Sequence, residues 1–193
     1  MNRELEAATP LSEDEKDQLI PRHLVNREQL NEWEQRNILE AEQWAFSQRR
    51  TRVLSAGFVR ALHRRMFDRT WKWAGSFRTT DRNIGVPAHQ IPTALRNSLD
   101  DAEHWLENEV FPIPEVAVRL HHRLVSVHPF PNGNGRHARL AADVLLFNLN
   151  KSRLDWGGPP LDSSGQKREE YIRALQAADA GDFHPLLQFV GLV

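Results

Sequence analysis

The sequence has no cysteine among its 193 residues. This absence excludes disulfide bonds, thiolate metal ligands and a cysteine nucleophile, and it is compatible with a reducing compartment. No apolar run approaches the ~20 residues that a membrane-spanning helix needs. Residues 1–16 are acidic and lack the apolar core of a secretory signal. We therefore expect a cytoplasmic protein with no membrane contact.

An excess of positive charge is also missing, because 25 Lys and Arg face 26 Asp and Glu. The composition argues against a globally basic nucleic-acid-binding protein, and we expect no nucleic-acid partner. The charge is uneven along the chain, since residues 51–82 contain eight basic and two acidic residues. This stretch could face an anion or an acidic surface. Charge alone favours the plainer interpretation, a solvated helix face.

Linkers, internal repeats and low-complexity tracts are absent as well, and the length suits one domain over residues 1–193. Ser12 with Glu15 forms a capping box, and Asn26 and Ser55 can cap two further helices. The later helices are expected at about 92–109, 114–127, 136–150, 165–178 and 183–190, the last with Asp182 as its cap. The helix at 136–150 is apolar almost all round, which predicts a central, buried position. The fold class is all-α.

Residues 76–92 interrupt the helical pattern. Extended-favouring and turn-favouring residues are mixed here: Thr79, Thr80, Asn83, Ile84, Gly85, Val86 and Pro87. The segment is predicted to be a short β-hairpin or an ordered loop.

The most informative segment is 128–139, His-Pro-Phe-Pro-Asn-Gly-Asn-Gly-Arg-His-Ala-Arg. Its glycine-rich loop runs into a helix N-terminus, where unpaired amides and the helix dipole favour an anion. Arg136 and Arg139 are three positions apart and project from one side of the first turn, which suits a di- or triphosphate. His128 can act as a proton acceptor beside the phosphates. The plainer alternative is an ordinary connection, with Asn134 as a cap and the arginines in surface ion pairs.

This segment resembles the signature of the Fic (filamentation induced by cAMP) proteins, H-P-F-x-[D/E]-G-N-G-R-x-x-R. The segments 27–45, 62–85 and 171–189 are also similar to Fic proteins, and the whole resembles a small bacterial subgroup, mobile mystery protein B. The resemblance implies a helical Fic core over 22–193 with an N-terminal extension at 1–21. It also implies a flap at about 78–91.

The same resemblance implies an activity, the transfer of AMP from ATP to a Ser, Thr or Tyr hydroxyl of a target protein. In this family His128 would take the hydroxyl proton, and Phe130 would anchor the loop in the core. The phosphates would be bound by Gly133, Asn134, Gly135, Arg136 and Arg139. The target segment would pair with the flap backbone at Asn83, Ile84, Gly85 and Val86.

One residue departs from the family pattern. Asn132 occupies the position of an Asp or Glu that ligates Mg²⁺ or Mn²⁺, and an amide is a weaker ligand for such a cation. The alternative function is therefore a nucleotide-binding or partner-binding protein with weak or no transferase activity. A third possibility, phosphotransfer as in Doc-like relatives, is disfavoured because those relatives have a lysine within the loop.

Three further expectations concern regulation and histidines. The family's inhibitory motif, [S/T]-x-x-x-E-[G/N], has no clean match, because Thr9 and Glu13 are followed by Asp14. An antitoxin-like partner in trans is therefore one option for control. His128 follows a helix whose negative end would favour its protonated form, which cannot act as a base. His137 falls in a variable position of the signature and is expected to be a spectator.

Overall fold

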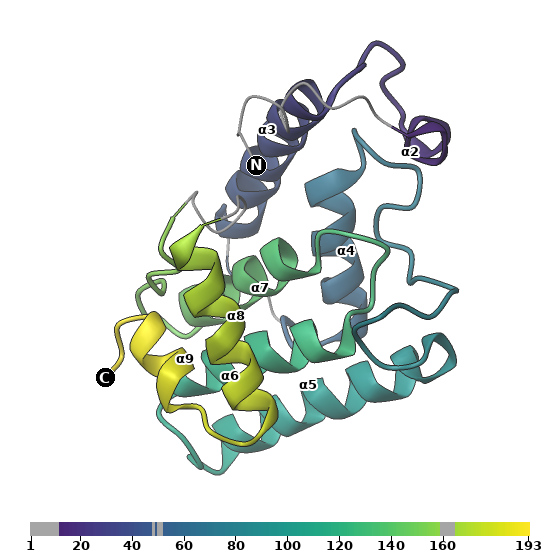
Figure 1. Cartoon of the computed structure of the whole chain (residues 1–193). Coiled ribbons are helices and arrows are strands. Elements are labelled where there is room, and N and C mark those ends of the chain that lie inside the picture. The colour runs from purple at the N-terminus through teal and green to yellow at the C-terminus, as the bar shows by residue number, and fades with distance from the viewer. Residues whose placement is uncertain (1–11, 48, 50–51, 159–164) are drawn as a thin grey trace.

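The chain folds into helices around one central helix (Figure 1). The computed structural model describes residues 12–47, 49, 52–158 and 165–193. The elements are α2 (Glu13–Gln18), α3 (Arg27–Phe46), α4 (Ala56–Phe67), a short 3₁₀ turn η1 (Ala88–Gln90), α5 (Ile91–Glu107), α6 (Ile113–Val127), α7 (Asn134–Asn148), α8 (Gln166–Asp179) and α9 (His184–Phe189). No strand is formed in the described residues, and Leu19 and Trp71 form an isolated antiparallel bridge. The all-α prediction is confirmed.

Local capping explains where several helices begin. The Ser12 hydroxyl accepts the Glu15 amide, and the Glu15 carboxylate accepts the Ser12 amide in return, as predicted. Asn26 and Ser55 likewise cap α3 and α4 through their side-chain oxygens. The predicted cap Asp182 is wrong for α9, because the N-cap is Phe183 and no side chain caps the helix; Asp182 only accepts the amide of His184 at 3.0 Å. The starts of α2, α3 and α4 depend on residues within three positions, which is why the sequence could predict them.

Helix α7 occupies the centre of the molecule, between α3 and α4 on one side and α6 on the other (Figure 1). All its residues from 140 to 146 are buried, as the apolar pattern predicts. It begins at Asn134, two residues earlier than expected, because Gly133 before it adopts a left-handed conformation with φ of 76°. The signature loop is thereby anchored directly on the core.

The expected short β-hairpin in the flap is not formed. Residues 77–87 contain no strand, and the 3₁₀ turn η1 follows them. The flap backbone instead bonds to the segment after α6: the amide of Arg78 donates to the Pro129 carbonyl at 2.9 Å, and that of Val86 donates to the Val127 carbonyl at 3.4 Å. The backbone on both sides of the flap is therefore bonded to a third segment, and the two sides are joined to each other through side chains, as where the amide of Ala88 donates to the Asp81 carboxylate at 2.7 Å.

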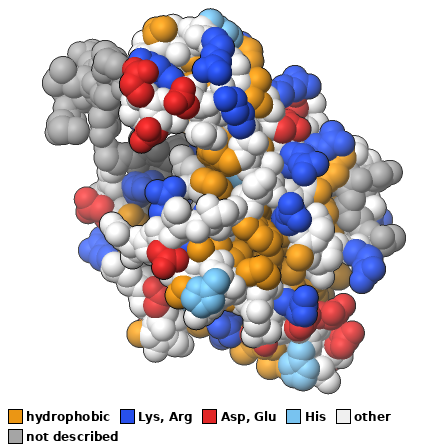
Figure 2. Space-filling view, turned by 90° about the vertical axis from the view of Figure 1, so that its right-hand side faces the viewer, with side chains coloured by type: hydrophobic (Ala, Val, Ile, Leu, Met, Phe, Trp, Pro, Cys, Tyr) orange, Lys and Arg blue, Asp and Glu red, His pale blue; other side chains and the backbone are white. Residues whose placement is uncertain are grey.

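The Lys and Arg residues of the basic stretch at 51–82 are exposed to solvent, except for the buried Arg78, and several of their side chains contact the rest of the fold. Arg60 donates to the Gly75 carbonyl at 3.0 Å, Arg65 lies over the ring of Trp44, and Arg69 pairs with Glu40 at 2.8 Å. On the face drawn in Figure 2, Lys and Arg side chains are interspersed with Asp, Glu and hydrophobic ones. The plainer interpretation of this stretch is supported. No helix in the described part of the chain is long and apolar enough to cross a membrane.

Candidate functional site

The signature loop leaves the end of α6 and enters α7 through a tight turn at Gly133. A Cβ atom at Gly133 would lie 2.5 Å from the ring of Phe67, and the residue's φ of 76° suits glycine. Asn134 fixes the loop further, because its side chain accepts the Phe130 amide and donates to the Phe130 carbonyl, both at 2.9 Å. Its side chain is therefore committed to the loop, which leaves the backbone amides of the first turn to face a ligand.

A buried histidine that sequence reasoning missed supports this loop from below. His63 stacks on Phe130 with ring centroids 3.6 Å apart. Its Nδ1 accepts the Gly75 amide at 3.0 Å, so the proton is on Nε2, which donates to the Asn132 carbonyl at 3.1 Å. Burial, aided by the nearby His137, lowers the pKa of His63 well below its usual value. No local pattern could have indicated this residue, because its partner lies 69 positions away.

His128 ends α6 in a left-handed conformation, with φ of 51° and ψ of 58°. The helix end was expected to favour its protonated form, and the structure gives the opposite result. Burial, followed by the positive charges of Arg78 and Arg82, lowers the pKa of His128 below its usual value. Desolvation and the two cations outweigh the Val125 carbonyl in the last turn of α6, which raises the pKa. The imidazole is therefore neutral at physiological pH, as a general base must be.

The two signature arginines are held by different elements. Arg136 pairs with Glu34 of α3 at 2.7 Å, and Glu34 also accepts the Trp71 indole N–H at 2.5 Å. Glu34 is only 5% exposed. The guanidinium of Arg139 lies over the ring of Tyr171 on α8, 5.9 Å from its centroid. Glu34 was not identified from the sequence, because it is 102 positions from its partner.

Tyr171, which Arg139 contacts, is itself paired with a buried histidine. The Tyr171 hydroxyl is 2.8 Å from Nε2 of His121, which is fully buried on α6. Burial, and then the charge of Arg139, lowers the pKa of His121 well below its usual value. The neutral histidine thus stands between α6 and α8 without competing with the arginines for an anion.

The signature residues come together at a cavity of about 550 Å³, the signature cavity. His128, Asn132, Gly133, Asn134, Gly135, Arg136 and Arg139 all line it, together with Ile84 of the flap. The other proposed flap residues, Asn83, Gly85 and Val86, do not line it, and Phe130 is fully buried beneath it. The charged side chains on the described wall are Arg27, Arg136, Arg139 and Arg168 against Glu34, apart from any charge on His128. Such a cavity attracts an anion.

The donor set of the cavity does not fit a tightly bound Mg²⁺. The side-chain oxygen of Asn132 accepts the Gly133 amide at 2.7 Å, and its backbone oxygen is bonded to His63. The Glu34 carboxylate is committed to Arg136 and Trp71. No cluster of three or more His, Cys, Asp or Glu side chains suited to a metal is found in the described residues. A hard cation would meet an amide where it requires a charged oxygen.

His137 does not line the signature cavity, and its contacts are structural. It is 1% exposed, and its Nε2 is 2.9 Å from the Val59 carbonyl of α4. Burial lowers its pKa to about 4. It ties the first turn of α7 to α4 and contacts Phe130 edge-on, so its role is structural.

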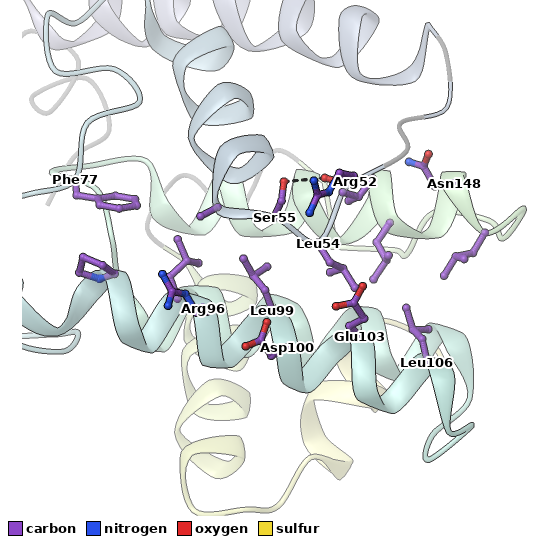
Figure 3. Close-up of a pocket in the computed structure, with 16 residues that line it drawn as sticks. Arg52, Leu54, Ser55, Phe77, Arg96, Leu99, Asp100, Glu103, Leu106 and Asn148 are labelled. Atoms are coloured by element: carbon purple, nitrogen blue, oxygen red, sulfur yellow. Dashed lines mark hydrogen bonds between the residues drawn. The ribbon is translucent and has the colours of Figure 1, made fainter.

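A second cavity of about 550 Å³ lies between α5, α7 and the segment before α4 (Figure 3). Its wall is mostly apolar, with Arg96, Asp100 and Glu103 along one side. It shares no lining residue with the signature cavity and contains none of the predicted site residues. Arg136 and Arg139 also line a neighbouring cavity of about 670 Å³ beside Asp143 and Arg153, but His128, Asn132 and the glycine-rich loop line the signature cavity alone. The chemistry predicted from the sequence therefore centres on the signature cavity.

Together, the helical fold and the loop at the start of α7 define a domain in which a glycine-rich loop and two arginines share one cavity wall with His128. Residues 53–146 match the family model described as Fic/DOC family. The chain therefore contains a Fic/DOC family domain. The subgroup suggested by the sequence stays a prediction.

Individual relatives agree with this assignment. The chain is 34% identical over 121 residues to the protein adenylyltransferase fic-1 of Caenorhabditis elegans, covering 61% of this chain and 22% of that protein. It is 33% identical over 120 residues to the protein adenylyltransferase Fic of Drosophila grimshawi, covering 60% and 23%. The chain thus spans less than a quarter of the length of these curated relatives.

A solved structure shares the fold. The N-terminal Fic domain of a putative cell filamentation protein from Bartonella quintana, with bound ADP, matches with a TM-score of 0.65 at 18% identity. The match covers 87% of this chain and 86% of that one.

Proposed function

We propose that this chain is a protein adenylyltransferase that transfers AMP from ATP to a Ser, Thr or Tyr hydroxyl of a target protein. The observation that supports it most is the neutral His128 on the same cavity wall as the glycine-rich loop and two arginines. The relatives named above as protein adenylyltransferases support the reaction class. The bound ADP in the Bartonella domain supports an adenine nucleotide as the donor.

In the proposed reaction the hydroxyl oxygen of the target attacks the α-phosphorus of ATP. A bond forms between these atoms, and the bond from the α-phosphorus to the bridging oxygen of the β-phosphate breaks. Pyrophosphate leaves, and His128 takes the hydroxyl proton. The step needs no covalent protein intermediate, since positioning and charge neutralisation lower its barrier.

The phosphates would be bound by the loop and the arginines. The amides at Asn134 and Gly135 would cradle them, as at other helix N-termini, and the amide of Gly133 would join them on leaving the side-chain oxygen of Asn132. Arg136 would contact the β- and γ-phosphates while shared with Glu34, and Arg139 would contact the γ-phosphate. Mg²⁺ or Mn²⁺ with Asn132 as ligand was part of the sequence hypothesis. The oxygen atoms of Asn132 and Glu34, which are already hydrogen-bonded, do not support this metal site.

The target segment would lie along the flap, next to His128. Ile84 is 61% exposed and also lines the cavity, which supports contact with both donor and target. Main-chain groups at Asn83, Ile84, Gly85 and Val86 would align the target by extended pairing. Because the amide of Val86 already bonds to Val127, the groups before it would supply most of this pairing.

The proposal extends to the chain's organisation and context. Residues 1–193 would form one domain, with 22–193 as the Fic core and 1–21 as an extension. A cytoplasmic location and an antitoxin-like regulator would complete it. The regulator is proposed because Thr9 and Glu13 lack the following Gly or Asn; Thr9 lies outside the described residues.

The test compares α-labelled and γ-labelled ATP, with a bacterial lysate as the source of targets, in Mg²⁺, in Mn²⁺ and in EDTA. Label from the α-phosphate on protein is the expected result, and His128→Ala should abolish it while leaving nucleotide binding intact. Label only from the γ-phosphate would indicate a kinase. Binding without any transfer would support the alternative, a nucleotide-binding protein disabled at Asn132.

A further inference from the structure

A buried arginine of the flap, Arg78, donates hydrogen bonds to three backbone carbonyls. Arg78 is 3% exposed. Its Nε donates to the His128 carbonyl at 2.8 Å, one terminal nitrogen donates to the Thr80 carbonyl at 2.9 Å, and the other donates to the Val86 carbonyl. Its own amide donates to the Pro129 carbonyl. One side chain thus joins both sides of the flap to the catalytic histidine.

The chemistry of this contact is unusual for a buried cation. Buried charges are normally paired with an opposite charge. Arg78 forms no ion pair with any residue that the structure describes, and backbone carbonyls take the place of a carboxylate. The planar guanidinium suits this task, because it presents several N–H donors in a fixed geometry that a lysine cannot reproduce.

Arg78 bonds to the backbone of His128, which has an energetically unfavourable conformation. His128 adopts a left-handed backbone, which a residue with a side chain populates only when its surroundings require it. Gly85 of the flap packs on it so closely that a Cβ atom there would lie 2.6 Å from the His128 Cβ and 2.9 Å from the Arg78 guanidinium. The flap and the histidine therefore share one contact surface, and Arg78 crosses it.

We propose that Arg78 is a positioning residue for the transfer reaction, holding the flap and the backbone of His128 as one rigid unit so that a hydroxyl aligned on the flap meets the imidazole. The inference rests on the proposed function. It assigns to Arg78 a role in the use of the acceptor and none in binding the donor, because its contacts are with the flap and with the His128 backbone. Arg78 does not line the signature cavity.

A second consequence concerns the charge state of His128. Arg78 and Arg82 of the flap segment act on it directly. The charged groups on the wall of the signature cavity, which His128 also lines, are Arg27 and Glu34 from α3, Arg136 and Arg139 from α7, and Arg168 from α8. Burial is the largest cause of its lowered pKa, and Arg78 is the next. A variant that loses the positive charge at position 78 therefore makes the imidazole easier to protonate.

The first experiment needs no substrate. The His128 ring is titrated by NMR in the full chain, in the wild type and in the Arg78→Gln and Arg78→Lys variants, with His128→Gln to assign the signal. The pKa should rise in Arg78→Gln and stay near that of the wild type in Arg78→Lys, which keeps the charge. An unchanged titration in a folded Arg78→Gln variant would overturn the electrostatic part of the inference.

The second experiment separates acceptor from donor. Arg78→Lys keeps the charge but not the three-sided geometry, so the rate of AMP transfer should fall about 100-fold, as expected when a reacting group is misplaced by about 1 Å. The Kd for ATP should stay within about threefold of the wild type, since positioning acts on the acceptor alone. Arg96→Gln is the matched control, because Arg96 is exposed on α5 beside the other cavity (Figure 3).

The outcomes are distinguishable. Transfer by Arg78→Lys at the wild-type rate would overturn the positioning role, as would a loss of ATP binding equal to the loss of rate. If Arg78→Gln does not fold, the Arg78→Lys comparison still decides the positioning role. If the wild type transfers no AMP, the proposed function fails, while the NMR titration still reports whether Arg78 controls the histidine.

Discussion

Asn132 directs its side-chain oxygen to the amide of Gly133, within the loop that carries it. Replacing it with Asp keeps that acceptor and adds a second, charged oxygen at an exposed position on the cavity wall. Asn132→Asp should therefore strengthen ATP binding in Mg²⁺ by ~1–3 kcal/mol, by analogy with charged against neutral partners, or roughly one to two decades. Calorimetric titrations in Mg²⁺ and in EDTA would measure this. A gain of equal size in EDTA would show that the metal is not its cause.

Glu34 pairs with Arg136 through a carboxylate that also lines the proposed phosphate site. Glu34→Gln should lower the free energy of unfolding by ~1–3 kcal/mol, since a buried charged partner is lost. It should also tighten ATP binding, because a negative charge beside the phosphates is removed. Urea unfolding and ATP titration measure the two effects.

Glu40→Gln on the same helix is the matched control for Glu34. Glu40 pairs with Arg69 at a similar distance, but both side chains are at least half exposed. Its loss should cost less than ~1 kcal/mol. Weaker ATP binding by Glu34→Gln would mean that Glu34 orients Arg136 for the phosphates more than it repels them.

At the scale of elements, the turn that joins α6 to α7 depends on one glycine. Gly133→Ala would place a methyl group 2.5 Å from the Phe67 ring and force a left-handed alanine. We expect a loss of ~1–3 kcal/mol in the free energy of unfolding, the usual cost of such strain. Gly57→Ala in α4 has open space and an ordinary helical backbone, so it should be neutral or stabilising by ~0.5–1 kcal/mol. Equal effects in thermal or urea unfolding would contradict this account.

The elements also show which features a sequence can predict. Capping residues and apolar periodicity act over a few positions, so Ser12, Asn26 and Ser55 marked real helix starts and 136–150 marked the buried centre. The predicted hairpin in the flap is wrong, although the β-branched residues there favour extended structure. In the structure Arg78 donates to the carbonyls of Thr80, Val86 and His128. The amides of Arg78 and Val86 bond to the segment after α6. Tertiary contacts of this kind override local propensity.

In the candidate site, too, local features could be predicted from the sequence and long-range contacts could not. The residues of the signature are contiguous, so their chemistry could be inferred from the loop alone. Glu34, His63 and Arg78 could not be found in this way, because each acts on the signature from 50 or more positions away. The family resemblance supplied roles for the loop, but not the supports beneath it.

For the whole molecule, buried neutral histidines predict that acid destabilises the fold. His63, His121 and His137 have a lowered pKa in the folded state. As the pH falls below ~6.5, the unfolded chain binds protons that the native state does not, so stability is present above that pH and is lost below it. For His137, whose folded pKa is about 4, the loss should reach ~2 kcal/mol at pH 5.

Urea unfolding at pH 7.5 and pH 5 would measure this loss. His137→Gln should reduce the pH dependence, because it removes one of the titrating groups while an amide can still reach the Val59 carbonyl. A stability that is the same at both pH values would contradict the neutral, buried state of all three histidines.

The ion pair between Arg136 and Glu34 joins residues 102 positions apart, and the cavity wall is completed by Tyr171 and Arg168 of α8. No early part of the chain contains all of these groups. During synthesis on the ribosome, a nascent chain that ends before α8 lacks one side of the pocket. We therefore expect the growing polypeptide to acquire affinity for ATP only after α8 has emerged, so that the proposed activity arises together with the finished fold.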